Sequence, residues 1–265
     1  MRETGRTTIE IEHDDGITTL RFNRPERLNA LDITMAEAFH DAVVEVVEDA
    51  STRVIVLTGA GDAFLAGGDL AAMEQAGQDT VATVDAIIRP AHAAMQRLME
   101  APQPTIAQLH GAVAGAGMSV AMATDLAVAA DNTRFNLAYV NIGAVPDCSG
   151  SWSLPRLVGV RRALEIALLS ETIDADEARA LGLVNRVVPA SRLASETRQL
   201  AQRLAAGPPI AQGHIKRLIR SSLDNDLPGQ LAAEEQAFKD CAATHDFRDA
   251  VSAFLRRESP VFRGR

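Results

Sequence analysis

The first half of the chain alternates short apolar runs with longer helical stretches, and this alternation constrains the fold more than any other feature. Three runs are predicted as buried strands because they are short and strongly apolar: Val54–Thr58, Pro104–Leu109 and Leu126–Ala130. Val81–Glu100 and the small, apolar Gly115–Thr124 are predicted as helices between them. Strands that alternate with helices are typical of crossover units, so we expect an α/β fold with a mostly parallel sheet.

The N-terminal segment predicts a β-hairpin followed by a helix. Thr8–Glu12 and Ile17–Phe22 alternate in polarity around a His-Asp-Asp-Gly turn. Thr34, with Glu37 three residues later, matches the capping box that opens many helices. Apolar residues then recur at helical spacing, so we expect a helix with Thr34 as its N-cap.

After Ser149 the pattern changes to helices. Leu183–Val188 is the one extended segment expected there, and Gly207-Pro208-Pro209 is the clearest break. We therefore divide the chain into a core, residues 1–206, and a C-terminal helical region, residues 207–265. The predicted helices are Arg161–Leu169, Ala175–Leu181, Arg192–Ala206, Pro209–Leu223, Gly229–Ala243 and Phe247–Arg257.

Composition excludes several classes of function. A net charge of −9 argues against general binding of nucleic acid or of an anionic membrane, although local Arg and Lys can still bind a phosphate-bearing small molecule. No apolar run reaches the roughly 18 residues of a membrane span. Cys148 and Cys241 are too few for a disulfide framework or a metal site, and no metal-ligand spacing occurs. We expect a cytoplasmic protein without a metal.

Three segments carry candidate chemistry, and two of them place glycines where a strand gives way to a loop or helix. A glycine-rich loop lets a backbone N–H approach a ligand closely, and a helix that begins there favours negative charge. Two such loops facing one another would form an anion hole, whereas either loop alone also fits a plain turn. The segments are Asn23–Leu31, Gly59–Leu70 and His110–Met118.

Taken together and in this order, the three segments resemble the crotonase superfamily, the enoyl-CoA hydratase/isomerase family. The resemblance covers nearly the whole chain and extends to the C-terminal Phe254 and Pro260–Arg265. It implies a crotonase-like spiral of β-β-α units followed by a C-terminal helical region. It also implies an acyl-CoA thioester substrate, with coenzyme A as part of the substrate and no permanently bound cofactor. Homotrimers, often paired into hexamers, are the implied assembly.

The resemblance also implies roles for individual residues. The N–H groups of Gly68 and Ala116 would form an oxyanion hole for the thioester oxygen as it becomes an enolate. Arg24 is left open, and Lys216 and Arg217 fit either phosphate contact or a solvated helix face. The implied coenzyme A contacts are Arg27, Leu28 and Ala30 on one side and Ala66, Asp69 and Leu70 on the other.

The sequence departs from the family's hydratases at the two positions that carry their catalytic glutamates. These positions are Ser119 and Tyr139 here, and neither side chain has an ordinary pKa near neutrality. We expect both to line the pocket, with the Tyr139 hydroxyl available to orient substrate. His110, which precedes a turn, is expected to be a hydrogen-bonded structural group. Efficient hydration, which needs two proton-transfer groups, is therefore not expected.

One carboxylate remains nearby, at Asp147. The matching position serves as a base in dienoyl-CoA isomerases and ring-epoxide isomerases of phenylacetate breakdown, and as a nucleophile in 4-chlorobenzoyl-CoA dehalogenases. The stretch Pro146–Arg156 is similar to the phenylacetate-type isomerases. A single base suffices for isomerisation, because it takes a proton from one carbon and returns it to another. The alternative for Asp147 is the N-cap of a helix over Ser149–Leu157.

We therefore expect an enoyl-CoA isomerase in which Asp147 moves the proton of an enolate held by Gly68 and Ala116. Three alternatives stay open. They are an enoyl-CoA hydratase whose water is held by Ser119 or Tyr139, an aryl-CoA enzyme that uses Asp147 as nucleophile, and a non-catalytic acyl-CoA binder.

Overall fold

A β-hairpin opens the fold in the computed structural model, which describes residues 7–265. Strand β1 (Ile9–Asp14) pairs antiparallel with β2 (Ile17–Phe22), and Asp14 lies opposite Ile17. Asp15 and Gly16 form the turn with positive φ angles of 47° and 77°, the conformation that Asp and Gly tolerate best. The predicted hairpin is confirmed.

The hairpin continues into a six-stranded sheet with the order β1-β2-β3-β5-β7-β10. Every pairing after the hairpin is parallel, as the alternation of strands and helices predicted. The apolar runs coincide with these strands because a strand covered on both faces needs apolar residues at every position. The added strands are β3 (Val54–Gly59), β5 (Thr105–Leu109), β7 (Leu126–Ala130) and β10 (Arg186–Val188).

A second, four-stranded sheet was not predicted from the sequence. Its strands are only two or three residues long, too short to show a periodic pattern. Each central strand is followed by one of them, β3 by β4, β5 by β6 and β7 by β8. This repetition produces the expected spiral of β-β-α units. The sheet has the order β4-β6-β8-β9 and consists of β4 (Ala63–Leu65), β6 (Ala112–Ala114), β8 (Arg134–Asn136) and β9 (Ile173–Asp174).

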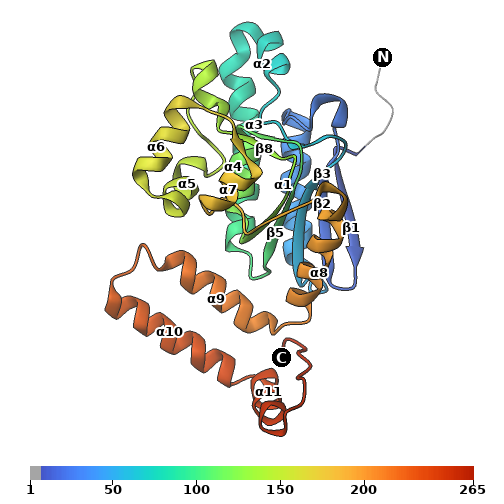
Figure 1. Cartoon of the computed structure of the whole chain (residues 1–265), viewed down its shortest axis with the longest axis vertical. Helices are drawn as coiled ribbons and strands as arrows, with labels where there is room; N and C mark the ends of the chain where they lie inside the picture. The colour runs from blue at the N-terminus through green and yellow to red at the C-terminus, as the bar shows by residue number, and fades with distance from the viewer. Residues whose placement is uncertain (1–6) are drawn as a thin grey trace.

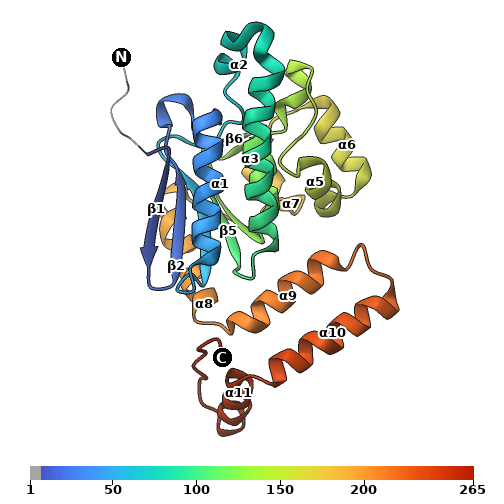
Figure 2. The same cartoon turned by 180° about the vertical axis from the view of Figure 1, so that it is seen from behind.

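Helices cover both faces of the large sheet. Helices α1 (Ile33–Glu48) and α3 (Thr80–Glu100) lie side by side on one face (Figure 2). Helix α8 (Leu193–Ala205) covers the opposite face (Figure 1), where Leu200 and Ala201 pack against the strands. The capping-box prediction is wrong by two residues, because the Asp32 carboxylate accepts the cap hydrogen bond from Met35 N.

The remaining core helices surround the small sheet. Helix α4 (Ala116–Ala123) is buried along its whole length, which explains why its sequence lacks a polar face. Helix α2 (Leu70–Ala76) was not predicted. The others are α5 (Gly150–Val158), α6 (Val160–Leu169) and α7 (Ala175–Ala180).

The C-terminal helices extend away from the core (Figure 1). They are α9 (Pro209–Ser221), α10 (Leu227–Ala242) and α11 (His245–Arg256). The chain reaches them through Gly207 and Pro208, next to the boundary that we placed at residue 206. Among residues 7–265, no helix is long and apolar enough to cross a membrane.

A buried ammonium group fixes α9 to the core. Lys216 Nζ donates to the carbonyls of Leu98 and Gln103 and pairs with Asp125 at 3.0 Å. Burial lowers the pKa of Lys216, and the Asp125 carboxylate opposes this. The solvated interpretation of Lys216 is therefore wrong, because the side chain is buried and its ammonium group binds three oxygens of the core. Arg217 instead lies on the exposed side and donates to His214.

The Asn29 amide joins two of the motif segments. Asn29 is fully buried, and its Nδ2 donates to the carbonyls of Ala60, Ala63 and Phe64 at 2.8–3.1 Å. Its Oδ1 accepts from Arg24 N at 2.9 Å. Each partner is a backbone group, so one side chain binds polar main-chain atoms in both segments.

Replacing Asn29 by alanine should therefore destabilise the whole core. We expect Asn29→Ala to lower the free energy of unfolding by about 3 kcal/mol, because several buried carbonyls lose their donor. Urea denaturation measures this value. Asn225→Ala is the matched control, since the Asn225 amide lies at the surface and donates to Gln230. Equal unfolding free energies for the two variants would contradict the assignment.

Candidate active site

The loop after β4 carries Gly68, the first of the two predicted donors. Leu31 forms an isolated parallel bridge with Gly68: Leu31 N donates to Gly67 O and Asp69 N donates to Leu31 O. Gly68 lies between the two residues that bind Leu31. In a parallel bridge the N–H of this middle residue points away from the partner strand, here away from Leu31. Among residues 7–265, the N–H of Gly68 has no acceptor.

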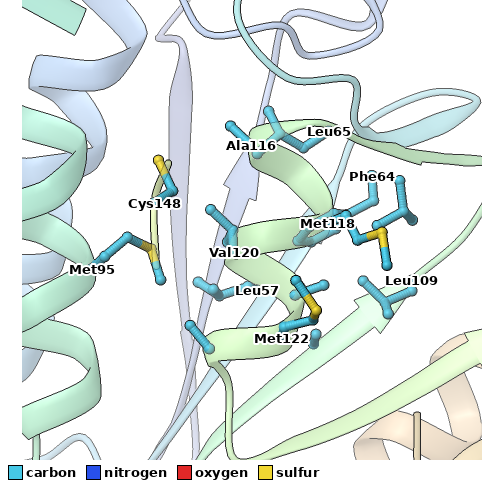
Figure 3. Packing of buried hydrophobic residues seen from close by; sticks show 14 of the residues in the cluster. Leu57, Phe64, Leu65, Met95, Leu109, Ala116, Met118, Val120, Met122 and Cys148 are labelled. Carbon is cyan, nitrogen blue, oxygen red and sulfur yellow. The ribbon is translucent and has the colours of Figure 1, made fainter. Parts of the chain in front are cut away.

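The first residue of α4 presents a second N–H beside this loop. Ala116 follows Gly115, whose φ is 52°, and the first N–H groups of a helix have no intrahelical partner. A Cβ at Gly67 would lie 3.5 Å from Ala116 N, and one at Gly117 would lie 1.9 Å from Leu65 O. Backbone therefore packs directly on backbone here, as the adjacent Leu65 and Ala116 in Figure 3 indicate. The two predicted donors are brought together.

Asp147 lies at the centre of a polar cluster on the neighbouring turn. The Tyr139 hydroxyl donates a short hydrogen bond to Asp147 Oδ1 and lies 3.3 Å from Ser119 Oγ. Ser119 is on α4, one turn after Ala116, and is fully buried. Tyr139 is in the 3-10 helix Ala138–Ile142. The Tyr139 hydroxyl therefore links the three side chains that the sequence singled out, with Asp147 on one side and Ser119 on the other.

The N-cap interpretation of Asp147 is wrong. Helix α5 begins at Gly150, its N-cap position is Ser149, and within the described chain no side chain caps it. The Asp147 carboxylate instead accepts from Tyr139, and the Asp147 carbonyl accepts from Gly150 N at 2.8 Å. Asp147 is half-buried, and its carboxylate is turned toward Tyr139 rather than toward a helix end.

Burial and charge change the protonation of Tyr139. Burial raises the pKa of the Tyr139 hydroxyl far above its usual range, and the Asp147 charge adds to the increase. Tyr139 is therefore a neutral hydrogen-bond donor at physiological pH and not a base. Neither Ser119 nor Tyr139 supplies the proton-transfer group that a glutamate would.

The turn that carries Asp147 has an unusual backbone. Cys148 and Ser149 have φ angles of 45° and 70°, which cost a non-glycine residue about 1 kcal/mol each or more. Cys148 N donates to His92 Nε2 at 3.1 Å. His92 was not singled out in the sequence, because a lone His on an amphipathic helix carries no signal of its own.

The Cys148 thiol, the Asp147 carboxylate and the His92 imidazole lie within 4.8 Å of one another. Such a set is a possible metal site. Here, however, His92 Nε2 already accepts a hydrogen bond, and burial raises the pKa of the Cys148 thiol well above its usual range. The donor set therefore favours hydrogen bonding over metal ligation.

The residues that the resemblance implies as coenzyme A contacts differ in their surroundings. Some are exposed, whereas Asp69 is bound to other groups of the protein. Arg27, Leu28 and Leu70 are exposed and remain available to a ligand. Asp69 caps α2 through Ala72 N and pairs with Arg24 at 3.1 Å. Burial alone would raise the pKa of Asp69, but the hydrogen bonds from Ala72 and Arg24 outweigh this effect and lower it.

Arg24 and His110 have structural partners. Arg24 Nη1 donates to Ala30 O at 2.6 Å, and Arg24 Nη2 also pairs with Asp32. The open question about Arg24 is thus answered in favour of a structural role. His110 Nε2 lies 3.0 Å from Gly61 O, as expected for a hydrogen-bonded structural residue. Ala30 and Ala66 are partly exposed, and Ala66 N donates to Leu28 O.

A cavity of about 720 Å³ begins beside the Asp147 turn and continues toward α9. His92 and Ser149 border it at the turn, Met95, Met99 and Trp152 give it apolar walls, and Lys216 and Arg220 lie at its far side. Its size is sufficient for a bulky organic group.

The chain matches known proteins over nearly its whole length. The family model described as enoyl-CoA hydratase/isomerase matches residues 12–265. A 1,2-epoxyphenylacetyl-CoA isomerase from Escherichia coli (strain K12) is 36% identical over 95% of this chain and 97% of its own. A 4-chlorobenzoyl coenzyme A dehalogenase-2 from Arthrobacter sp. is 34% identical over 94% of this chain and 91% of its own.

A solved structure of a protein named as an enoyl-CoA hydratase has the same fold as this chain. The enoyl-CoA hydratase from Polaromonas sp. JS666 superposes with a TM-score of 0.92 at 33% identity, covering 96% of this chain and 99% of the other. The chain therefore belongs to the enoyl-CoA hydratase/isomerase family, the crotonase superfamily. It is an enzyme of this family.

The raised pKa of Tyr139 can be measured directly, because Tyr139 is the only tyrosine in the sequence. We expect no tyrosinate absorbance near pH 10, the ordinary tyrosine pKa. Asp147→Asn removes the charge contribution and should lower the Tyr139 pKa, although burial still keeps it raised. Ultraviolet titration of both proteins is the measurement.

The raised pKa of Tyr139 also predicts how the free energy of unfolding depends on pH. Because the pKa is higher in the folded state, the folded chain holds more protons than the unfolded chain above about pH 10. The Tyr139 contribution to stability is therefore complete below pH 10 and is lost as the pH rises further. An ordinary tyrosinate transition in the folded protein would contradict this assignment.

Proposed function

We propose that this enzyme isomerises an enoyl-CoA through a thioester enolate. The N–H groups of Gly68 and Ala116 would bind the thioester oxygen, and the Asp147 carboxylate would take a proton from one carbon and return it to another. The double bond moves, and no atom is gained or lost. The observation that carries the proposal is the Asp147 carboxylate, which is bonded to Tyr139 and is not used as a helix cap.

The composition of the polar cluster favours isomerisation over hydration. Hydration needs one group to activate water and another to protonate carbon. Asp147 is the one carboxylate of this cluster, and Tyr139 is neutral because burial raises its pKa. The hydroxyl groups of Ser119 and Tyr139 are also hydrogen-bonded to each other. Neither hydroxyl is therefore placed as a base that activates water. Hydratase activity with these residues is the weaker alternative.

Two further alternatives give distinct expectations. A nucleophilic Asp147, as in an aryl-CoA enzyme, is suggested by the similarity to the Arthrobacter dehalogenase. The Tyr139 hydrogen bond does not separate this role from that of a base, because a donor on the carboxylate withdraws charge from a nucleophile and from a base alike. A non-catalytic acyl-CoA binder would keep the oxyanion donors and show no turnover.

The substrate's coenzyme A portion would lie along the exposed side of the first two motif segments. Arg27 supplies positive charge for phosphate, and Leu28 and Leu70 supply exposed apolar surface. Ala30 and Ala66 are small enough to allow close approach of the pantetheine. Asp69 contributes through its cap and its pair with Arg24, which hold this surface in place.

The C-terminal helices expose a large apolar surface, which supports a homotrimer or hexamer. Ile215 and Ile219 on α9, Leu231 and Phe238 on α10 and Phe254 on α11 are each at least half exposed. Exposed large apolar side chains, where they form a patch, usually mark a protein interface. A neighbouring copy of the chain is the proposed partner.

The oxyanion role of Ala116 can be tested by removing its N–H. Proline is tolerated at the first position of a helix, so Ala116→Pro should fold and lack the donor. We expect its kcat to fall about 10²- to 10³-fold. Val160→Pro is the matched control, since Val160 is also the first residue of a helix that follows a glycine with positive φ. An unchanged kcat in Ala116→Pro would refute the oxyanion assignment.

The reaction type can be tested with 2-enoyl-CoA and 3-enoyl-CoA and product mass. Isomerisation leaves the mass unchanged, whereas hydration adds one water. Asp147→Asn should lower isomerisation by about 10³-fold or more, since the base is lost. Asp41→Asn, on an exposed side chain of α1, serves as the control. Hydrated product, or an Asp147→Asn variant as fast as the native enzyme, would contradict the proposal.

A further inference from the structure

His92 supports the Asp147 turn from outside. It lies on α3, and its Nε2 accepts the backbone N–H of Cys148 at 3.1 Å. A ring nitrogen that accepts a hydrogen bond carries no hydrogen itself, so this contact uses the form of the ring with its hydrogen on Nδ1. The accepted N–H belongs to the residue directly after Asp147. Loss of the His92–Cys148 hydrogen bond would therefore free the backbone next to Asp147 and allow its carboxylate to shift.

The turn needs external support because its own backbone is strained. Cys148 and Ser149 both occupy the left-handed region, with φ angles of 45° and 70°. Non-glycine residues hold this conformation only where surrounding contacts impose it. Asp147 O accepts from Gly150 N, but this bond spans the turn itself and does not fix the turn to the core.

Two other contacts restrict the turn from the inside. The Cys148 side chain is 1% exposed and lies between α3 and α4, beside Met95 (Figure 3). A Cβ at Gly150 would lie 2.4 Å from Ser119 Oγ, so the end of the turn packs tightly on α4. These are packing contacts, which restrict the space around the turn without a defined hydrogen-bond direction. The His92 hydrogen bond adds a directional contact with a backbone donor.

We propose that His92 is a positioning residue for Asp147. By holding Cys148 N–H, it fixes the turn so that the carboxylate faces Tyr139 and the carbon held at the oxyanion site. This inference rests on the proposed function, in which Asp147 moves the proton. Displacing a catalytic group by about 1 Å can lower a rate by about 100-fold, so a distant backbone contact can control kcat.

The two amides that resemble histidine give a matched pair of variants. In glutamine, the terminal amide reaches the position of Nε2, so its oxygen can accept from Cys148 N. In asparagine, the terminal amide reaches only the position of Nδ1 and cannot. His92→Gln and His92→Asn thus differ by one methylene and in whether the hydrogen bond can form.

We expect His92→Asn to lower kcat about 10- to 100-fold, with KM changed less than about twofold. His92→Gln should restore kcat to within about threefold of the native enzyme. In an Asp147→Asn background, His92→Asn should have no further effect, because residues that act as a unit are not additive. Native-like kcat in His92→Asn, or equal loss in both variants with unchanged unfolding free energy, overturns the proposal.

Amide hydrogen exchange tests the positioning without turnover. The Cys148 amide should be protected in the native protein and in His92→Gln, and should exchange faster in His92→Asn. Unchanged protection in His92→Asn overturns the inference even if Asp147→Asn is inactive. Loss of protection in His92→Asn with a native protein that isomerises nothing supports the His92 contact and rejects the proposed function instead.

Discussion

Direct packing of backbone on backbone between the loop after β4 and the start of α4 is the constraint on which the site depends. Gly117 has no space for a Cβ against Leu65 O, and Gly67 lies against Ala114 and Ala116. Within residues 7–265, this contact holds two N–H groups without acceptors, at Gly68 and Ala116, on elements of the core. Asn29 strengthens the arrangement by binding three carbonyls of the β3–β4 region, so that the loops keep their shape without a ligand.

A pocket built from backbone donors does not select a reaction. The same two N–H groups suit any chemistry that places negative charge on a thioester oxygen. Selection rests with the side chains around the reacting carbons, here Ser119, Tyr139 and Asp147. They come from α4, a 3-10 helix and the turn before α5, three segments whose relative positions the second sheet and the α3–α4 packing fix. A small change in one of these segments changes the chemistry and leaves the fold unchanged.

Much of this arrangement could be predicted from the sequence, and the failures have physical causes. The central strands were predictable because burial on both faces makes them continuously apolar. The strands of the second sheet were not, since two or three residues show no period. The glycine pattern located the Gly68 and Ala116 loops because close backbone contact leaves few alternatives to glycine. The roles of His92 and Lys216 depend on backbone partners far away in the sequence, Cys148 N and Leu98 O, and the role of Arg24 depends in part on the distant Asp69 carboxylate. No local sequence pattern records such contacts. Asp147 beside a helix start resembled a cap until Tyr139 was found to occupy its carboxylate.

The exchange of a glutamate for Tyr139 has an electrostatic consequence that reaches beyond the loss of an acid. Two carboxylates in contact repel each other, so one of them takes up a proton and the pair titrates as a unit. A neutral tyrosine hydroxyl avoids this repulsion and donates to Asp147 instead, and Ser119 is close enough to Tyr139 to continue the network. The cluster then carries one negative charge, on Asp147. When that carboxylate accepts a proton from the substrate, the charge passes to the thioester oxygen, where the Gly68 and Ala116 donors lie. Proton transfer thus moves one negative charge from the Asp147 carboxylate to the thioester oxygen. No second charge arises in the buried cluster, which is what an isomerisation with a single base requires.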